Sequence, residues 1–278
     1  MKVETDEGIY GLGEVGIREW GGAIEHLSEM VVGEDPFSTE CLWQHMFRKS
    51  FFPANKVYSC AISAIDIALW DIKGKALGMP VYKFLGGSVR YKVMCYPHIS
   101  GENKRRAVEE LRGVQDGWKF VHWHHPKKIE SFKPDGTERR LDPQKSIRRA
   151  EEPMPLVREA IGSDSDICFD VHTRLDTAHA ITLCKALEAH RPFFIEDPLR
   201  SENPSSYRNL ARHVSLPIAA GEQWALKWAF REVIEEELIN YTRIDLCIVG
   251  GLTEALKVTN WCETHYIDIA PPITRLDP

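Results

Sequence analysis

The chain has 278 residues, of which 43% are hydrophobic and 27% are charged. These values are typical of a folded globular protein and exclude a disordered or fibrous chain. The formal net charge of −6 and the pI near 6.0 provide no basic surface for a phosphate backbone. Nucleic acid is therefore excluded as a partner, and a small-molecule ligand is favoured.

No apolar stretch approaches the roughly 18 residues that a membrane-spanning helix needs, and the first residues, MKVETDEG, are too charged for a signal peptide. The seven cysteines are scattered singly without a C-x-x-C pair, which indicates buried free thiols rather than a zinc or redox site. We therefore expect a cytoplasmic protein without membrane contact.

The first part of the chain predicts an α+β unit over residues 1–90. Residues 2–15 alternate polar and apolar side chains around two glycines, a pattern that predicts two short strands joined by a tight turn. Residues 59–77 carry apolar side chains at helical spacing, and Gly78 and Pro80 end this predicted helix. The strands have no partner strand upstream, so we expect that an N-terminal part of this unit is missing.

Beyond residue 90, short apolar strands alternate with amphipathic helical stretches, which is typical of βαβ units and a parallel sheet. The predicted strands are 92–97, 119–124, 167–171, 193–196, 217–220, 242–246 and 266–270. The polar residues 129–144 predict an extended loop after the second strand. Because a closed barrel of this kind needs about eight strands, residues 91–278 predict a modified (β/α) TIM-type barrel without its last strand.

Three acids stand at the carboxyl ends of successive predicted strands: Asp170, Glu196 and Glu222. The two intervals, 196 − 170 and 222 − 196, are both 26 residues, about one β/α unit each. The rim at the carboxyl ends of the strands is where barrel enzymes hold their chemistry. Three converging carboxylates repel one another, and a hard cation such as Mg²⁺ relieves that repulsion. The alternative for each acid is a helix cap or a pair with an arginine.

Four segments carry a resemblance to a known family. They are the helix-like Ser63–Lys75, followed by Pro80, and the short motifs at 169–172 (FDVH), 195–198 (IEDP) and 220–223 (AGEQ). These segments resemble the enolase superfamily, in particular its mandelate racemase branch and the acid-sugar dehydratases of the galactonate type. The resemblance implies an α+β capping domain over a modified barrel, with Asp170, Glu196 and Glu222 as Mg²⁺ ligands.

The resemblance also implies the chemistry: removal of the proton next to a substrate carboxylate, through an enediolate stabilised by Mg²⁺. Such a proton is very weakly acidic, and a cation makes its removal possible by neutralising the charge that develops in the transition state. The implied substrate is a small-molecule carboxylate, an acid sugar.

Histidines on the predicted strand 119–124 and just after the predicted strand 167–171 are candidate acids or bases. His172 lies two residues beyond Asp170, and the resemblance implies that it protonates the departing 3-hydroxyl group. The segment Val121–His125 replaces the Lys-x-Lys pattern of many racemase-branch enzymes, which favours elimination over racemisation. In this segment His124 is a candidate catalytic or metal-adjacent residue, and His122 is a candidate substrate contact. The alternative is a structural role for these histidines.

Asp245 resembles the acid that pairs with a histidine of the next strand to form the general base of the branch. Pro272 stands where that histidine is expected, and proline has no ionisable group, so Asp245 lacks the expected partner. Asn55 lies in a segment that resembles the loop that closes over substrate, although packing against the barrel explains it equally well. Asn55 and Arg174 are the remaining candidate substrate contacts.

The leading prediction is an Mg²⁺-dependent lyase that dehydrates an aldonate to a 2-keto-3-deoxy acid. One alternative is a non-catalytic or truncated family member, since the expected base is absent and residues 273–278 depart from the family pattern. The other is an epimerase or cycloisomerase on the same scaffold. An unpaired sheet edge would favour association into a homo-oligomer.

Overall fold

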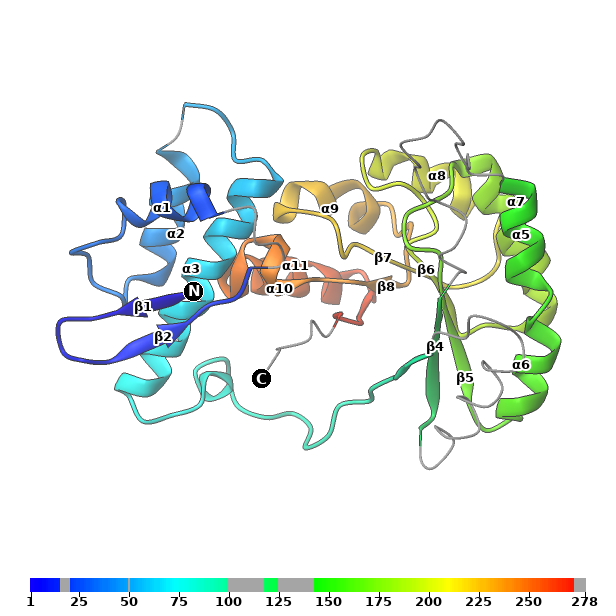
Figure 1. Ribbon diagram of the computed structural model, residues 1–278, viewed down its shortest axis with the longest axis horizontal. Helices are drawn as coiled ribbons and strands as arrows, with labels where there is room; N and C mark the ends of the chain where they lie inside the picture. The colour runs from blue at the N-terminus through cyan, green and yellow to red at the C-terminus, as the bar shows by residue number, and fades with distance from the viewer. Residues whose placement is uncertain (16–20, 50, 100–117, 125–142, 273–278) are drawn as a thin grey trace, which may run out of the picture. The chain divides into compact units, whose positions relative to one another are not determined.

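The computed structural model describes residues 1–15, 21–49, 51–99, 118–124 and 143–272 (Figure 1). The chain forms two compact units. The first contains Met1–Tyr91, Gly221–Glu237 and Thr242–Pro278, and the second contains Lys92–Ala220 and Leu238–Tyr241. Within the described part of the chain, no helix is long and apolar enough to cross a membrane. The division into domains 1–90 and 91–278 stays a prediction.

The first unit begins with the predicted hairpin. Strands β1 (Lys2–Glu4) and β2 (Tyr10–Leu12) pair in antiparallel register. A Cβ atom at Gly11 would lie 2.0 Å from the carbonyl oxygen of Ala68, so only glycine permits this approach of β2 to the helix beside it. The expectation of two short strands is confirmed, and their close contact with a helix explains the glycine.

That helix is α3 (Lys56–Ala76), which packs with α1 (Gly21–Ser28) and α2 (Thr39–Arg48). It begins three residues earlier than the predicted start at residue 59, because the Asn55 side chain accepts a hydrogen bond from the Tyr58 backbone N–H at 3.1 Å and caps the first turn. A short 3₁₀ helix, η2 (Val81–Lys83), follows. The core of this unit includes Leu27, Leu42, Trp43, Met46, Ile62, Ile65 and Leu69.

Helices from the end of the chain complete the first unit: α9 (Leu226–Glu235), α10 (Leu246–Val249) and α11 (Gly251–Thr264). The last two pack against α3 through a polar seam. Asp66 accepts hydrogen bonds from Thr253, at 3.0 Å from the backbone N–H and 2.5 Å from the hydroxyl. The Ser63 hydroxyl oxygen accepts one from the Gly250 N–H at 2.9 Å. These bonds satisfy buried polar groups that would otherwise destabilise the fold.

The second unit contains the parallel part of the sheet. Its strands are β3 (His98–Ile99), β4 (Phe120–His124), β5 (Asp166–Asp170), β6 (Phe194–Glu196) and β7 (Ile218–Ala220), each parallel to the next. With β8 (Tyr241–Thr242) and β9 (Asp268–Ile269), the described residues give a seven-stranded sheet in the order β3-β4-β5-β6-β7-β8-β9. The prediction of an α/β fold with a parallel sheet and an N-terminal α+β region is confirmed.

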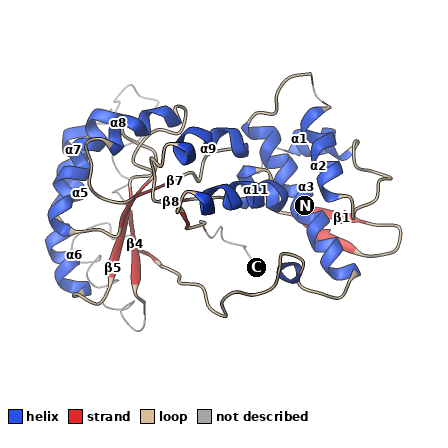
Figure 2. Cartoon of the chain, turned by 180° about the vertical axis from the view of Figure 1, so that it is seen from behind, coloured by secondary structure: helices blue, strands red, loops and turns tan. Residues whose placement is uncertain are grey.

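Helices follow the strands as the alternating pattern predicted. They are α5 (Pro143–Glu151), α6 (Met154–Ile161), α7 (Thr177–Leu187) and α8 (Tyr207–Ala211), with the 3₁₀ turns η4 (Glu188–His190) and η5 (Pro204–Ser206). Helices α5, α6 and α7 lie along one side of β4 and β5 (Figures 1 and 2). Ile167, Cys168 and Phe169 of β5 are at most 1% exposed, as expected for a strand covered on both faces.

The first predicted strand is misplaced. Residues 92–97 do not form a strand, and Val93 and Met94 are 72% and 55% exposed. The strand is instead His98–Ile99, because these are the residues that pair with His122 and Trp123 of β4. Backbone pairing to a neighbour, and not local apolar content, decides where a short strand forms.

The structure also bears on a second predicted strand and on the predicted loop. The strand predicted at 242–246 ends at Thr242, because Asp245 caps α10. The loop predicted at 129–144 falls mostly outside the described residues, and its last two residues belong to α5.

Candidate active site

The carboxyl ends of three neighbouring strands place polar side chains in register. His124 of β4 is opposite Asp170 of β5, and Asp170 is opposite Glu196 of β6. Parallel pairing brings strand ends of the same direction to one edge, which explains why residues far apart in sequence meet there. Two of the three predicted metal ligands, Asp170 and Glu196, therefore lie side by side.

Histidines of β4 contact both carboxylates. His122 Nε2 lies 2.9 Å from Glu196 Oε2, and both side chains are 1% exposed. His124 Nδ1 lies 2.8 Å from Asp170 Oδ2. His124 Nδ1 nevertheless makes no hydrogen bond among the described residues, because the angle of this contact does not suit one. It is an electrostatic contact. Ligand atoms of His122, Asp170 and Glu196 all lie within 4.8 Å of one another.

Asp170 is ionised in this setting. Burial alone would raise its pKa, but the close His124 side chain and the nearby His122 and His172 hold the pKa below the usual value for aspartate. An ionised carboxylate is what a divalent cation requires of a ligand.

One oxygen of this carboxylate is available to a cation. Asp170 is 2% exposed, and within the described part of the chain its Oδ1 atom is buried without a hydrogen-bond partner. A buried acceptor of this kind normally has a partner, because desolvation without one costs about 1–3 kcal/mol. The orphaned oxygen and the carboxylate donor set fit a hard cation such as Mg²⁺.

Glu222 follows β7 by two residues and belongs to the first compact unit. In that unit Arg243 Nη2 lies 3.8 Å from Glu222 Oε2, and the Glu222 side chain is 20% exposed. Gly221 has a φ of 128°, and a Cβ there would lie 2.9 Å from the Phe230 ring, so glycine is needed immediately before Glu222. That Glu222 shares one cation with Asp170 and Glu196 remains a prediction.

His172 lies in the loop after β5 and is held by an unusual backbone. Its φ is 60° and that of Thr173 is 58°, in the left-handed region that non-glycine residues rarely adopt. Such conformations cost about 1–3 kcal/mol each and occur often at functional sites. The Thr173 N–H donates to the Asp197 carbonyl at 2.8 Å and fixes this turn against the end of β6.

This turn brings the His172 ring to 6.4 Å from the His124 ring, centroid to centroid. Strand β5 ends at Asp170, so alternation along a strand does not set the direction of the His172 side chain. The left-handed turn positions it instead. Arg174, a candidate substrate contact, is partly buried in the same loop.

Asp245 and Asn55 both act as helix N-caps in the structure. Asp245 Oδ1 accepts a hydrogen bond from the Cys247 N–H at 2.7 Å at the start of α10, and burial raises the pKa of Asp245. Asn55 caps α3 as described above. Pro272 lies three residues past β9, so no ionisable side chain stands at that position. The catalytic role of Asp245 and the substrate contact of Asn55 stay predictions.

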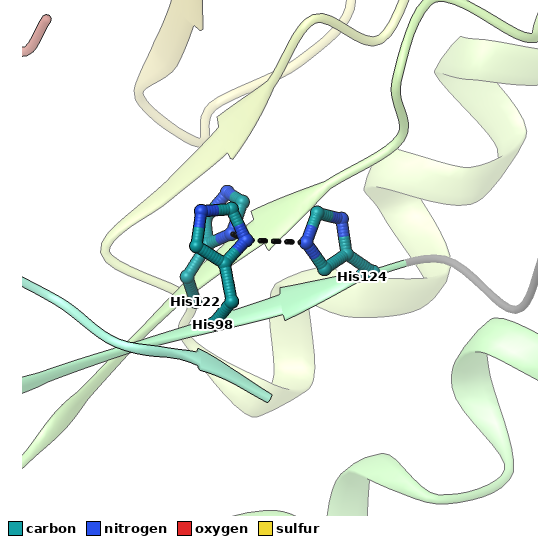
Figure 3. Close-up of side chains that lie close together, drawn as sticks. All are labelled: His98, His122 and His124. Atoms are coloured by element: carbon teal, nitrogen blue, oxygen red, sulfur yellow. Dashed lines mark hydrogen bonds between the residues drawn. The ribbon is translucent and has the colours of Figure 1, made fainter. Parts of the chain in front are cut away.

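The sequence reasoning missed His98. This residue is on β3, in register with His122, and its Nδ1 atom lies 2.5 Å from His124 Nε2 and 2.9 Å from His122 Nδ1 (Figure 3). A signal was present: His98 precedes His124 by 26 residues, the same interval that separates the three acids. The misplaced first strand concealed it.

The fold and these side chains define a class of protein. Two buried carboxylates, of which Asp170 is ionised, stand at the carboxyl ends of parallel strands in an α/β protein, and one oxygen of Asp170 is open to a cation. This arrangement is typical of enzymes of the parallel α/β type and could hold a metal ion.

Comparison with known families makes the assignment specific. Residues 1–86 match the N-terminal domain of the mandelate racemase and muconate lactonizing enzyme family, and residues 106–276 match the enolase C-terminal domain-like family. The chain therefore belongs to the enolase superfamily, in its mandelate racemase and muconate lactonizing enzyme branch.

Three relatives show how close this likeness is. A D-galactonate dehydratase from Ralstonia pickettii is 36% identical over 277 residues, covering 98% of this chain and 70% of the relative. The 3,6-anhydro-D-galactonate cycloisomerase of Zobellia galactanivorans superposes with a TM-score of 0.85 at 28% identity, covering 98% of this chain and 74% of the other. An enolase from Agrobacterium radiobacter, solved with Na and L-malate bound, superposes with a TM-score of 0.87 at 25% identity, covering 99% and 69%. The prediction of an enzyme of the lyase class is confirmed.

Proposed function

We propose that this chain is an Mg²⁺-dependent dehydratase of an acid sugar, which converts an aldonate to a 2-keto-3-deoxy acid. Its similarity to a D-galactonate dehydratase over 98% of its length supports the reaction class. The observation that carries the proposal is the pair of buried carboxylates, Asp170 and Glu196, side by side at the strand ends.

Asp170, Glu196 and Glu222 would hold the Mg²⁺ ion. When bound, the ion supplies positive charge that stabilises the negative charge developing on the substrate carboxylate as the neighbouring proton leaves. Mg²⁺ favours carboxylate oxygens and keeps part of its coordination shell for water and substrate oxygens. The open Oδ1 atom of Asp170 supports this assignment.

The histidines of β4 would hold the carboxylates in position. His122 contacts Glu196 at 2.9 Å and His124 contacts Asp170 at 2.8 Å, so each imidazole limits the rotation of one carboxylate. Lysines occupy this strand in many racemase-branch relatives. Because no lysine stands on β4, a lysine base on this strand is excluded, which favours elimination in one direction over racemisation.

His172 would act as the general acid. In the dehydration, the C2 proton passes to a basic group, the C3–O bond breaks, and His172 gives its proton to the departing hydroxyl group, which leaves as water. The enol that remains tautomerises to the 2-keto-3-deoxy acid. The constrained turn at residues 172 and 173, and the 6.4 Å separation of the His172 and His124 rings, support a positioned acid.

A panel of aldonic acids tests this function. The purified chain, stripped of metal by a chelator, should be inactive, and added Mg²⁺ should restore conversion to a 2-keto-3-deoxy acid, detected by the keto group and by NMR. Unchanged turnover after exhaustive metal removal would contradict the proposal. Failure of every aldonic acid with Mg²⁺ present would favour a non-catalytic family member.

A cycloisomerase is the second candidate function, because the superposition with the Zobellia galactanivorans enzyme covers 98% of this chain. It would use the same metal ligands and differ in the fate of the substrate after the proton is removed. NMR of the product separates the two functions, since dehydration releases water and cycloisomerisation conserves the mass of the substrate.

A further inference from the structure

Three imidazole rings converge at the ends of β3 and β4. His98 Nδ1 faces His124 Nε2 at 2.5 Å and His122 Nδ1 at 2.9 Å (Figure 3). The ring centroids are 4.3 to 4.8 Å apart, and ligand atoms of the three histidines all lie within 4.8 Å of one another. Parallel pairing of the two strands, with His98 opposite His122, produces this convergence.

Hydrogen bonds between the three rings do not account for both short contacts of His98 Nδ1. A neutral ring nitrogen carries either one proton or one lone pair, so His98 Nδ1 makes at most one well-aligned hydrogen bond to its two nitrogen neighbours. Three protonated imidazoles at this distance would repel one another. A shared cation resolves both difficulties, because it accepts one lone pair from each ring.

The carboxylates behind the cluster prepare it for such a cation. His122 Nε2 lies beside Glu196 and His124 Nδ1 lies beside Asp170, so each acid favours a proton on the ring nitrogen that faces it. The lone pairs of His122 and His124 are then on Nδ1 and Nε2, the two atoms that face His98. Carboxylates commonly orient metal-binding histidines in this way.

We propose that His98 Nδ1, His122 Nδ1 and His124 Nε2 form a binding site for a borderline transition-metal cation, of which Zn²⁺ is the representative, separate from the site of the oxygen-coordinated Mg²⁺. Three imidazole nitrogens suit Zn²⁺, Co²⁺ or Ni²⁺ and not Mg²⁺, which requires oxygen. This proposal does not depend on the proposed dehydratase activity.

The geometry needs only a small adjustment. Zn–N distances of about 2.0–2.1 Å in a tetrahedral site place neighbouring nitrogens roughly 3.3 Å apart. His98 Nδ1 lies 2.5 Å from His124 Nε2 and 2.9 Å from His122 Nδ1, so side-chain rotations that move these nitrogens by less than about an ångström suffice. His98 is exposed, whereas His122 is buried, so water has access to complete the coordination from the His98 side.

Direct binding tests the proposal without reference to turnover. Zn²⁺ is titrated by calorimetry into the metal-stripped full chain in excess Mg²⁺, and Co²⁺ is added separately to record its visible absorption, which is strong when Co²⁺ is tetrahedral and weak when it is octahedral. The wild-type chain should bind one Zn²⁺ at this site. The His98→Asn variant, which removes an exposed ligand, should bind it at least ~10-fold more weakly and lose the Co²⁺ absorption.

The matched control is His45→Asn, the same change at an exposed histidine of α2, which should bind Zn²⁺ as the wild-type chain does. Mg²⁺ binding by His98→Asn should stay within about twofold of wild type, and its thermal unfolding without metal should be unchanged. Unaltered Zn²⁺ binding by His98→Asn would overturn the site. Equal weakening of Zn²⁺ and Mg²⁺ would also overturn it, because it would indicate one shared site.

Discussion

Two buried aspartates, one in each compact unit, differ in what surrounds them. Asp66 of α3 is 0% exposed and accepts hydrogen bonds from the backbone and hydroxyl groups of Thr253, and burial raises its pKa to about 6. Asp170 of β5 is 2% exposed, has histidine neighbours that lower its pKa, and keeps one oxygen without a hydrogen-bond partner among the described residues.

The difference separates an acid that holds the fold together from one placed for a ligand. Neutral donors satisfy Asp66 but do not offset the cost of burying its charge, so its carboxyl group stays protonated to a higher pH than an exposed aspartate does. Imidazoles keep Asp170 ionised, and no described residue donates a hydrogen bond to its Oδ1 atom. Burial alone would not distinguish the two.

The largest expected effect is on turnover and comes from a change of Asp170, the aspartate placed for a ligand. Asp170→Asn should lower turnover of the aldonate substrate by on the order of 10⁴-fold or more, because one ligand charge of the Mg²⁺ site is lost. The free energy of unfolding without metal should also fall, because asparagine lacks the charge that the neighbouring histidines stabilise. Turnover and urea unfolding measure the two effects. The exposed Asp164→Asn is the control, and wild-type turnover by Asp170→Asn would contradict the assigned ligand.

The His172→Asn variant tests the proposed general acid near Asp170. Loss of a general acid should lower kcat by about 10²- to 10³-fold with little change in KM, because the acid acts only as the hydroxyl group departs. The side chain of asparagine tolerates the left-handed backbone that His172 adopts, so the turn should survive. A rise in KM at constant kcat would indicate a substrate contact instead.

Asp66→Asn tests the structural side. Because the folded-state pKa of Asp66, about 6, exceeds the usual 3.8, the native state binds more protons than the unfolded state between these values. Its contribution to stability is therefore present at low pH and falls as pH rises from about 4 to 6, by about 3 kcal/mol in total.

The Asp66→Asn variant lacks this titration, so the stability of wild type relative to the variant should decline over that pH range. Urea unfolding at several pH values measures the decline. A constant difference between wild type and variant would show that Asp66 does not titrate there, and turnover near neutral pH should be close to wild type in either case.

The smallest expected effect concerns Asn55. Asn55→Ala should lower the free energy of unfolding by about 1 kcal/mol, because α3 loses its N-cap, whereas Asn55→Ser should keep most of it. KM should stay within about twofold of wild type in both variants if capping is the whole role. A higher KM in both would instead identify the substrate contact that the sequence resemblance implies.

Local residue patterns and the regular interval between the acids made the main helices, strands and metal-ligand candidates predictable from the sequence. The helical repeat of α3, the apolar runs of β5 and β6, and the interval of 26 residues between acids are all local or evenly repeated, and each predicts its element without knowledge of contacts. Asp170 and Glu196 could be found from sequence because a parallel sheet brings the ends of successive strands to one edge.

The particular contacts needed the structure. His98 was missed because the pairing of β3 with β4 moves the strand from 92–97 to 98–99. The position of His172 depends on a left-handed turn, and the residue types in that turn do not predict a left-handed backbone. Asp245 and Asn55 are candidate functional groups on resemblance alone, and only the structure shows that each also caps a helix.

The sequence by itself determined the class of fold and the acids that stand at strand ends, because periodicity and spacing are properties of the chain alone, and the resemblance of its motifs indicated the enzyme family. Only the tertiary structure decided which histidine nitrogens converge and which buried aspartate keeps an open oxygen. Those facts depend on strand register and side-chain direction, and a shift of one residue in pairing would turn each side chain to the other face of the sheet.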